Sequence, residues 1–133
     1  MNRLAIFLGA GALFSLGGCM AQPGAGRNGH ADDVPAARAI GRAESCIPIV
    51  QIQESRVRDD WTIDFRTSGN RWYRNSLPHR CNSLGLERAF SYSTSLSQLC
   101  STDTIWVIIG GGGIQRGATC GLGQFQPVTG APR

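Results

Sequence analysis

The sequence predicts a mainly β domain, either a small disulfide-stapled barrel or a compact sandwich of about six short strands. Three observations point to this class. Short runs alternate between apolar and polar residues, clusters of turn-forming residues separate the runs, and four cysteines are spread over the same region. No segment there has the pattern of a long helix. We expect one domain over residues 46–128, followed by a short tail at residues 129–133.

The clearest element is a hairpin. Residues 61–66 alternate strictly, which predicts that Trp61, Ile63 and Phe65 share one face of a strand. The turn-forming residues 68–70 follow, and residues 71–74 return as a second strand.

The other strands are read from the same signals. Pro48 favours an edge position or a strand start for residues 47–52. Residues 104–109 are apolar throughout, which predicts a strand buried on both faces, and the four glycines at 110–113 end it. Further strands are expected at residues 89–94 and 124–128, and a short helical turn at residues 95–101.

The N-terminus has the pattern of a bacterial secretory signal that ends in a lipobox. Arg3 precedes an apolar run over residues 4–16, which is too short to cross a hydrocarbon core that needs ~20 residues. Leu16, two glycines and Cys19 then resemble the site at which bacterial lipoproteins are cleaved and acylated. We therefore expect residues 1–18 to be a signal peptide and Cys19 to carry the lipid. The alternative is ordinary secretion, with cleavage after Ala21.

The residues after Cys19 predict a membrane address and a tether. Met20 stands where an aspartate commonly retains lipoproteins in the inner membrane, which favours the outer membrane of a Gram-negative bacterium. Residues 19–45 are rich in Gly, Ala and Pro and read as a tether with a reach of roughly 25 to 30 Å. Asp33 and Pro35 could start a short helix that Gly41 would end.

Charge and composition exclude several function classes. All 13 basic side chains are arginines, and no lysine is available for Schiff-base chemistry. One arginine lies in the signal, so the mature chain has 12 arginines against 9 acidic residues and a net charge of +3 before histidine. This charge is too small to indicate nucleic-acid binding.

The cysteines predict two disulfides. Apart from Cys19, the chain has Cys46, Cys81, Cys100 and Cys120, an even number that fits an oxidising compartment. Three pairings are possible. We favour Cys81–Cys100 with Cys46–Cys120, because the first pair would enclose one strand-and-loop unit and the second would join the two ends of the domain.

The sequence offers no strong catalytic or metal-binding pattern, and no cofactor is expected. Asp59 and Asp60 are adjacent, so an extended backbone would point them to opposite faces, and a turn is the better interpretation. His79 is the one histidine of the folded region, and its spacing to the cysteines matches no zinc motif. The serines lie in no nucleophile elbow, and the glycine runs lack phosphate-loop residues.

One segment suggests a contact surface, because arginines alternate with aromatic side chains around the hairpin. Arginine forks bind phosphates and carboxylates, and aromatic faces stack on sugars or guanidinium groups. The surface would meet an acidic envelope ligand, such as lipopolysaccharide phosphates or peptidoglycan carboxylates, or an envelope protein. The alternative is that the aromatics fill the core while the arginines pair with acids such as Asp64. The candidate residues are Arg66, Arg71, Trp72, Tyr73 and Arg74.

Several segments together resemble a family of uncharacterised bacterial exported domains. They are residues 57–65 (VRDDWTIDF), 72–78 (WYRNSLP), Cys81 with Leu84, 89–94 (AFSYST), Leu99-Cys100 with Asp103, and 120–125 (CGLGQF). The resemblance spans about residues 46–128 and implies a secreted, disulfide-bearing single domain. It implies no activity and no catalytic residues.

The sequence therefore predicts a lipid-anchored envelope protein that acts as a non-enzymatic binding module or as a structural, assembly module. Its expected partners are the membrane, through the lipid, and an acidic ligand or protein, and not nucleic acid. The alternative is a small envelope enzyme or a metal or redox protein that uses His79 with free cysteines.

Overall fold

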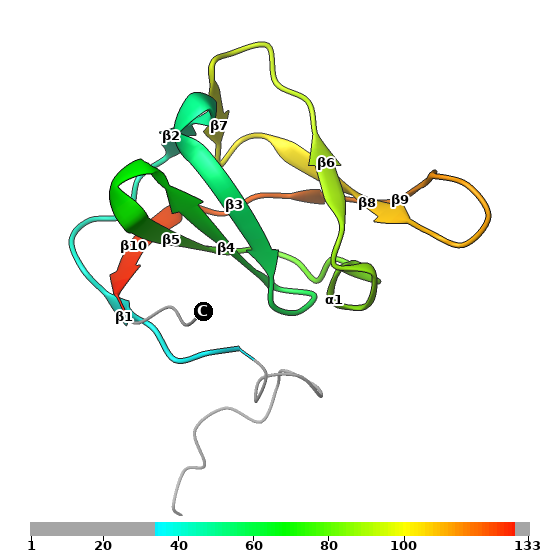
Figure 1. Cartoon of the computed structure of the whole chain (residues 1–133), viewed down its shortest axis with the longest axis horizontal. Helices are drawn as coiled ribbons and strands as arrows, with labels where there is room; N and C mark the ends of the chain where they lie inside the picture. The colour runs from blue at the N-terminus through cyan, green and yellow to red at the C-terminus, as the bar shows by residue number, and fades with distance from the viewer. Residues whose placement is uncertain (1–33, 130–133) are drawn as a thin grey trace, which may run out of the picture.

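The computed structural model describes residues 34–129, which form three antiparallel sheets (Figure 1). A five-stranded sheet has the order β1-β10-β5-β4-β3, a three-stranded sheet has the order β6-β8-β9, and β2 pairs with β7. The strands are β1 (Arg38–Ala39), β2 (Cys46–Pro48), β3 (Ile52–Val57), β4 (Thr62–Thr67), β5 (Arg71–Ser76), β6 (Phe90–Tyr92), β7 (Gln98–Cys100), β8 (Thr104–Ile109), β9 (Gln115–Gly121) and β10 (Phe125–Thr129). The single α-helix among these residues is α1 (Leu84–Glu87), and 3₁₀ turns lie at Ile49–Gln51 and Ser68–Asn70.

The hydrophobic core lies where the five-stranded and three-stranded sheets face each other. The ring of Phe65 on β4 meets Phe90 on β6 at 6.2 Å between centroids and Phe125 on β10 at 5.5 Å, both edge to face. Ile105 and Val107 of β8 are fully buried in the same cluster. The mainly β prediction is confirmed. The described sheets do not close into a barrel, so of the two predicted architectures the sandwich is the nearer one.

The predicted hairpin is the centre of the five-stranded sheet. β4 and β5 pair from Thr62 with Ser76 to Thr67 with Arg71. Gly69 has φ +76 in the turn between them, a left-handed backbone that glycine adopts without steric cost. Ile63 and Phe65 are fully buried on the core face, as the alternation predicted, but Trp61 lies just before the strand.

Several local predictions were wrong because long-range pairing decided the structure. The expected helix after Asp33 is absent from the described residues 34–41, where β1 pairs with β10. A helical turn was expected at residues 95–101, but this segment includes the strand β7, which pairs with β2. The expected strand at 47–52 is split by a 3₁₀ turn, and β9 was not predicted at all.

The prediction that β8 is buried on both faces was also wrong. Ile105 and Val107 are buried, whereas Thr104 is exposed and Trp106 is half-buried. Trp106 faces away from the core, and the guanidinium of Arg116 on β9 lies 4.4 Å from its ring centroid. The outward face of β8 is apolar although it is only half-buried. For this reason its sequence has the same pattern as a strand that is buried on both faces.

The domain begins before the predicted boundary at Cys46. Arg38 pairs with Thr129, Ala39 pairs with Val128, and Glu44 forms a bridge with Phe125. The segment from Arg38 to Glu44 is therefore held against the five-stranded sheet at both of its ends and is not a tether. The predicted signal peptide, Cys19 and the first part of the predicted tether lie outside the described residues.

Two disulfides form, but with a different pairing from the one favoured by the sequence. Cys46 is bonded to Cys100, and Cys81 is bonded to Cys120. The first pair joins directly opposite residues of β2 and β7, so strand register decided the connectivity. The second ties the segment before α1 to β9. Such bonds belong to a protein that folds in an oxidising, extracytoplasmic compartment.

Candidate functional site

The five residues of the predicted contact surface do not form one surface. In a strand, successive side chains point to opposite faces, and the register of β4 with β5 fixes which residues share a face. Tyr73 pairs with Phe65 and lies on the core face, together with Arg71 at the end of the strand. Trp72 pairs with Arg66, and both lie on the outer face with Arg74.

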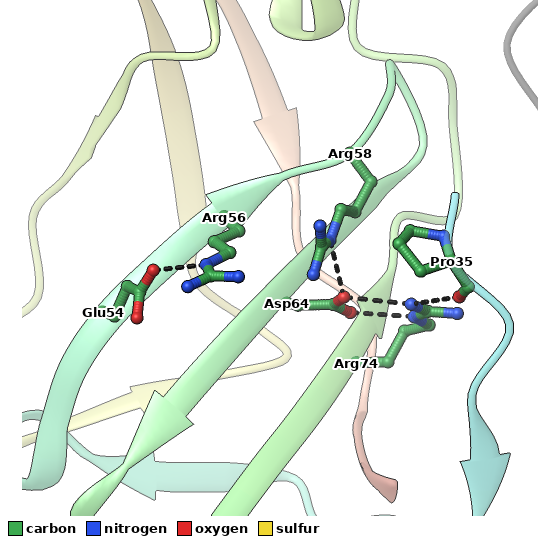
Figure 2. Close-up of polar contacts among 6 residues, drawn as sticks. All are labelled: Pro35, Glu54, Arg56, Arg58, Asp64 and Arg74. Atoms are coloured by element: carbon green, nitrogen blue, oxygen red, sulfur yellow. Dashed lines mark hydrogen bonds and ion pairs between the residues drawn. The ribbon is translucent and has the colours of Figure 1, made fainter. Parts of the chain in front are cut away.

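The outer face carries a buried ion-pair cluster around Asp64 (Figure 2). Asp64 has no exposed surface, although it lies on the face opposite the core. Arg74 donates to both of its oxygens, at 2.8 Å from Nε and 2.9 Å from Nη2, and Arg58 Nε donates at 2.8 Å. Arg74 Nη2 also donates to the carbonyl oxygen of Pro35 at 2.9 Å, which holds the incoming chain against β5. Arg74 therefore has a structural role.

A second, more exposed cluster lies beside it around Glu54 on β3. Arg66 Nε donates to Glu54 at 3.0 Å, and Arg56 donates to the other oxygen of the same carboxylate. These hydrogen bonds, first that of Arg56 and then that of Arg66, lower the pKa of Glu54 below its ordinary value. The guanidinium of Arg56 also lies 5.1 Å from the centroid of Trp72. The expectation that arginines pair locally with acids is confirmed on this face.

An open pocket of about 500 Å³ lies at one end of the five-stranded sheet, away from the two ion-pair clusters of the outer face. It lies where β5 and β10 meet the chain that follows β1. Two charged residues line it, Arg71 and Glu44. The remaining lining residues are Ile40, Asn70, Trp72, Tyr73, Pro127, Val128 and Thr129.

The two charges of the pocket flank the hydroxyl group of Tyr73. Tyr73 is buried, and its hydroxyl donates to Glu44 Oε1 at 3.2 Å. Burial raises the pKa of Tyr73, the negative charge of Glu44 raises it further, and Arg71 acts in the opposite direction. Arg71 is exposed, and its guanidinium makes no ion pair or hydrogen bond within residues 34–129. Glu44 and Arg71 therefore line one pocket without neutralising each other.

Glu44 was missed by the sequence reasoning because it falls in the predicted tether. Its bridge with Phe125 places it on the core face, near Tyr73. No local signal could have found this contact, since the two residues of the bridge are far apart in the chain. A buried tyrosine that needs an acceptor was the one indirect hint.

The other chemical candidates are not brought together. His79 is exposed in the loop after β5, and Cys46, Cys81, Cys100 and Cys120 are all in disulfides, so none of them supplies a thiolate. Within residues 34–129 no group of His, Cys, Asp and Glu could hold a metal ion.

Asp59 and Asp60 form the predicted turn. Asp59 Oδ1 accepts from the backbone N–H of Trp61 at 2.8 Å, and Asp60 Oδ1 accepts from that of Gly85 at the same distance. Asp60 also pairs with Arg80. Both carboxylates therefore fix the loop between β3 and β4 and its contact with α1.

Comparison with protein-family models, with curated proteins and with solved structures finds no match for this chain. The resemblance to exported bacterial domains therefore stays a sequence-based prediction. No helix within residues 34–129 is long and apolar enough to span a bilayer.

Proposed function

We propose that this protein is a lipid-anchored module of the bacterial cell envelope that binds an acidic ligand without chemical conversion. The ligand site is the open pocket at the end of the five-stranded sheet. Cys19 carries the lipid, and this lipid anchors the module in the outer membrane. The module faces the periplasm. The signal pattern and the lipobox support the anchor, and the two disulfides support export.

The pocket is the observation that carries the proposal. Arg71 is an exposed guanidinium beside an open space of about 500 Å³, and no acid within the described residues pairs with it. Arginine presents a planar fork of N–H donors that matches a carboxylate or a phosphate. The arginines of the outer face are weaker candidates, because they already form ion pairs with Asp64 and Glu54.

Titration followed by NMR tests the site. The mature chain, with both disulfides intact, is titrated with soluble muropeptides and, separately, with inorganic phosphate. We expect the muropeptides to shift the backbone amide signals of Asn70, Arg71 and Trp72. Arg71→Gln should weaken the affinity about tenfold, which corresponds to one charge-assisted hydrogen-bonded contact.

The matched control is Arg88→Gln, which removes one exposed arginine near α1 and leaves the pocket unchanged. Equal weakening by both variants would show a general charge effect and would refute the pocket as the site. If neither the muropeptides nor inorganic phosphate binds, the acidic-ligand function is refuted. The anchor is tested separately by the intact mass of the protein from its native membrane, where an unacylated N-terminus would refute it.

A further inference from the structure

The pocket holds two opposite charges, and this arrangement limits the ligands that fit it. Arg71 and Glu44 are the charged residues among its lining residues, and no ion pair joins them. Both act on the same hydroxyl group, that of Tyr73, with opposite sign. A carboxylate and a guanidinium held apart in this way can each accept the opposite charge of one bound molecule.

We propose that the pocket binds a short peptide through both a free carboxylate and a free ammonium group, a choice of ligand that rests on the proposed binding function. The ligand carboxylate lies on the Arg71 fork, and its ammonium group donates to Glu44. Free stem peptides of peptidoglycan carry both groups on one short chain.

The walls of the pocket fit the part of the peptide between the charges. Ile40 and Pro127 add apolar surface, and Pro127 pairs with Tyr73, whereas Trp72 and Val128 pair with each other on the outer face and only border the pocket. Asn70 and Thr129 offer an amide and a hydroxyl that can meet peptide groups. Mostly apolar walls with a few polar groups are typical of sites for small ligands.

Tyr73 is a positioning residue for Glu44. Its hydroxyl donates to Glu44 Oε1, which favours one position of this exposed carboxylate at the pocket. Tyr73 is itself fixed, because it is buried between β4 and β10. Glu44 is held at the other end by backbone hydrogen bonds to Phe125 in both directions.

The decisive experiment compares two forms of one probe, the tripeptide L-alanyl-γ-D-glutamyl-meso-diaminopimelate with free amines and the same tripeptide after acetylation of its amines. Calorimetry on the mature, oxidised chain should show about twofold to fivefold tighter binding of the free form, the value expected for one partly exposed charged contact. Glu44→Gln should bring this ratio close to one, since Gln keeps an acceptor for Tyr73 but carries no charge. Arg71→Gln should weaken both forms about tenfold and leave the ratio unchanged.

Controls and a second peptide complete the test. Glu87→Gln removes a carboxylate outside the pocket and should leave the ratio as in the unmodified chain. Tri-L-alanine tests whether the pocket distinguishes stem peptides, because weaker binding of this peptide would point to the peptidoglycan stem and equal binding to short free peptides in general. If both tripeptide forms bind equally and through Arg71, the acidic-ligand function stands and the ammonium site is refuted. If no probe binds, both fail.

Tyr73→Phe distinguishes a positioning role of the hydroxyl from a purely structural one, because only a positioning role changes the ratio of the two affinities. Loss of the hydroxyl should reduce the preference for the free amine while the affinity for the acetylated form stays constant. An equal loss of affinity for both forms would contradict the positioning role.

Discussion

Replacing Asp64 by asparagine is expected to destabilise the domain by about 3 kcal/mol, the lower end of the range for removing one partner of a buried ion pair. Asp64 is fully buried and accepts three hydrogen bonds from two guanidinium groups, all between 2.8 and 2.9 Å. Asparagine keeps one acceptor oxygen and presents N–H groups to a cation. The side chains of Arg58 and Arg74 are only 12% and 16% exposed, so water replaces the lost contacts poorly.

The assay is urea unfolding under oxidising conditions, followed by tryptophan fluorescence. A loss of about 3 kcal/mol should lower the urea midpoint with an unchanged denaturant slope. In a thermal melt of the same variant, the melting temperature should fall by roughly 12 to 24 °C in a domain of this size. Glu54→Gln is the matched control, because Glu54 also lies between two arginines on the same face but is 29% exposed. Exposed pairs contribute little, so the control should lose much less stability. Equal losses in the two variants would refute the argument that burial gives Asp64 its importance.

Three further predictions follow from the fold. Replacing either disulfide by a serine pair should cost about 4 kcal/mol in the chain-entropy model, since the bonds close loops with sequence separations of 54 and 39 residues; calorimetry that shows no loss would contradict this. Gly123→Ala should prevent folding or lower the melting temperature strongly, because its Cβ would lie 2.1 Å from the carbonyl oxygen of Ser76, whereas Gly110→Ala meets open space; circular dichroism melts compare the two, and equal melts would refute the close approach. Because the pKa of Tyr73 is raised in the folded state, its contribution to stability is present below about pH 10 and is lost as the pH rises through the raised value; Tyr73→Phe should therefore flatten the fall in stability above pH 10, and an unchanged profile would contradict this.

The sequence by itself determined the class of the fold and its central hairpin. Strict alternation over residues 61–66 determined the core face of β4. The side chains of a strand alternate between its two faces, and the hydrophobic effect buries the face that carries the apolar residues. The Asp59-Asp60 turn and the presence of two disulfides were equally readable, since aspartate side chains cap the local backbone and paired cysteines persist in an oxidising compartment.

The tertiary structure decided what local patterns could not. Arg71, Trp72, Tyr73 and Arg74 were predicted to share one contact surface, but the register with β4 and β10 places them on two faces of the sheet. The disulfide pairing followed from strand neighbours that are distant in sequence. Glu44 reaches the pocket because it forms a bridge with Phe125 of β10, although the segment around it has the composition of a linker. Long-range hydrogen bonding and burial outweigh local propensity at these positions, and the candidate site is made of such contacts.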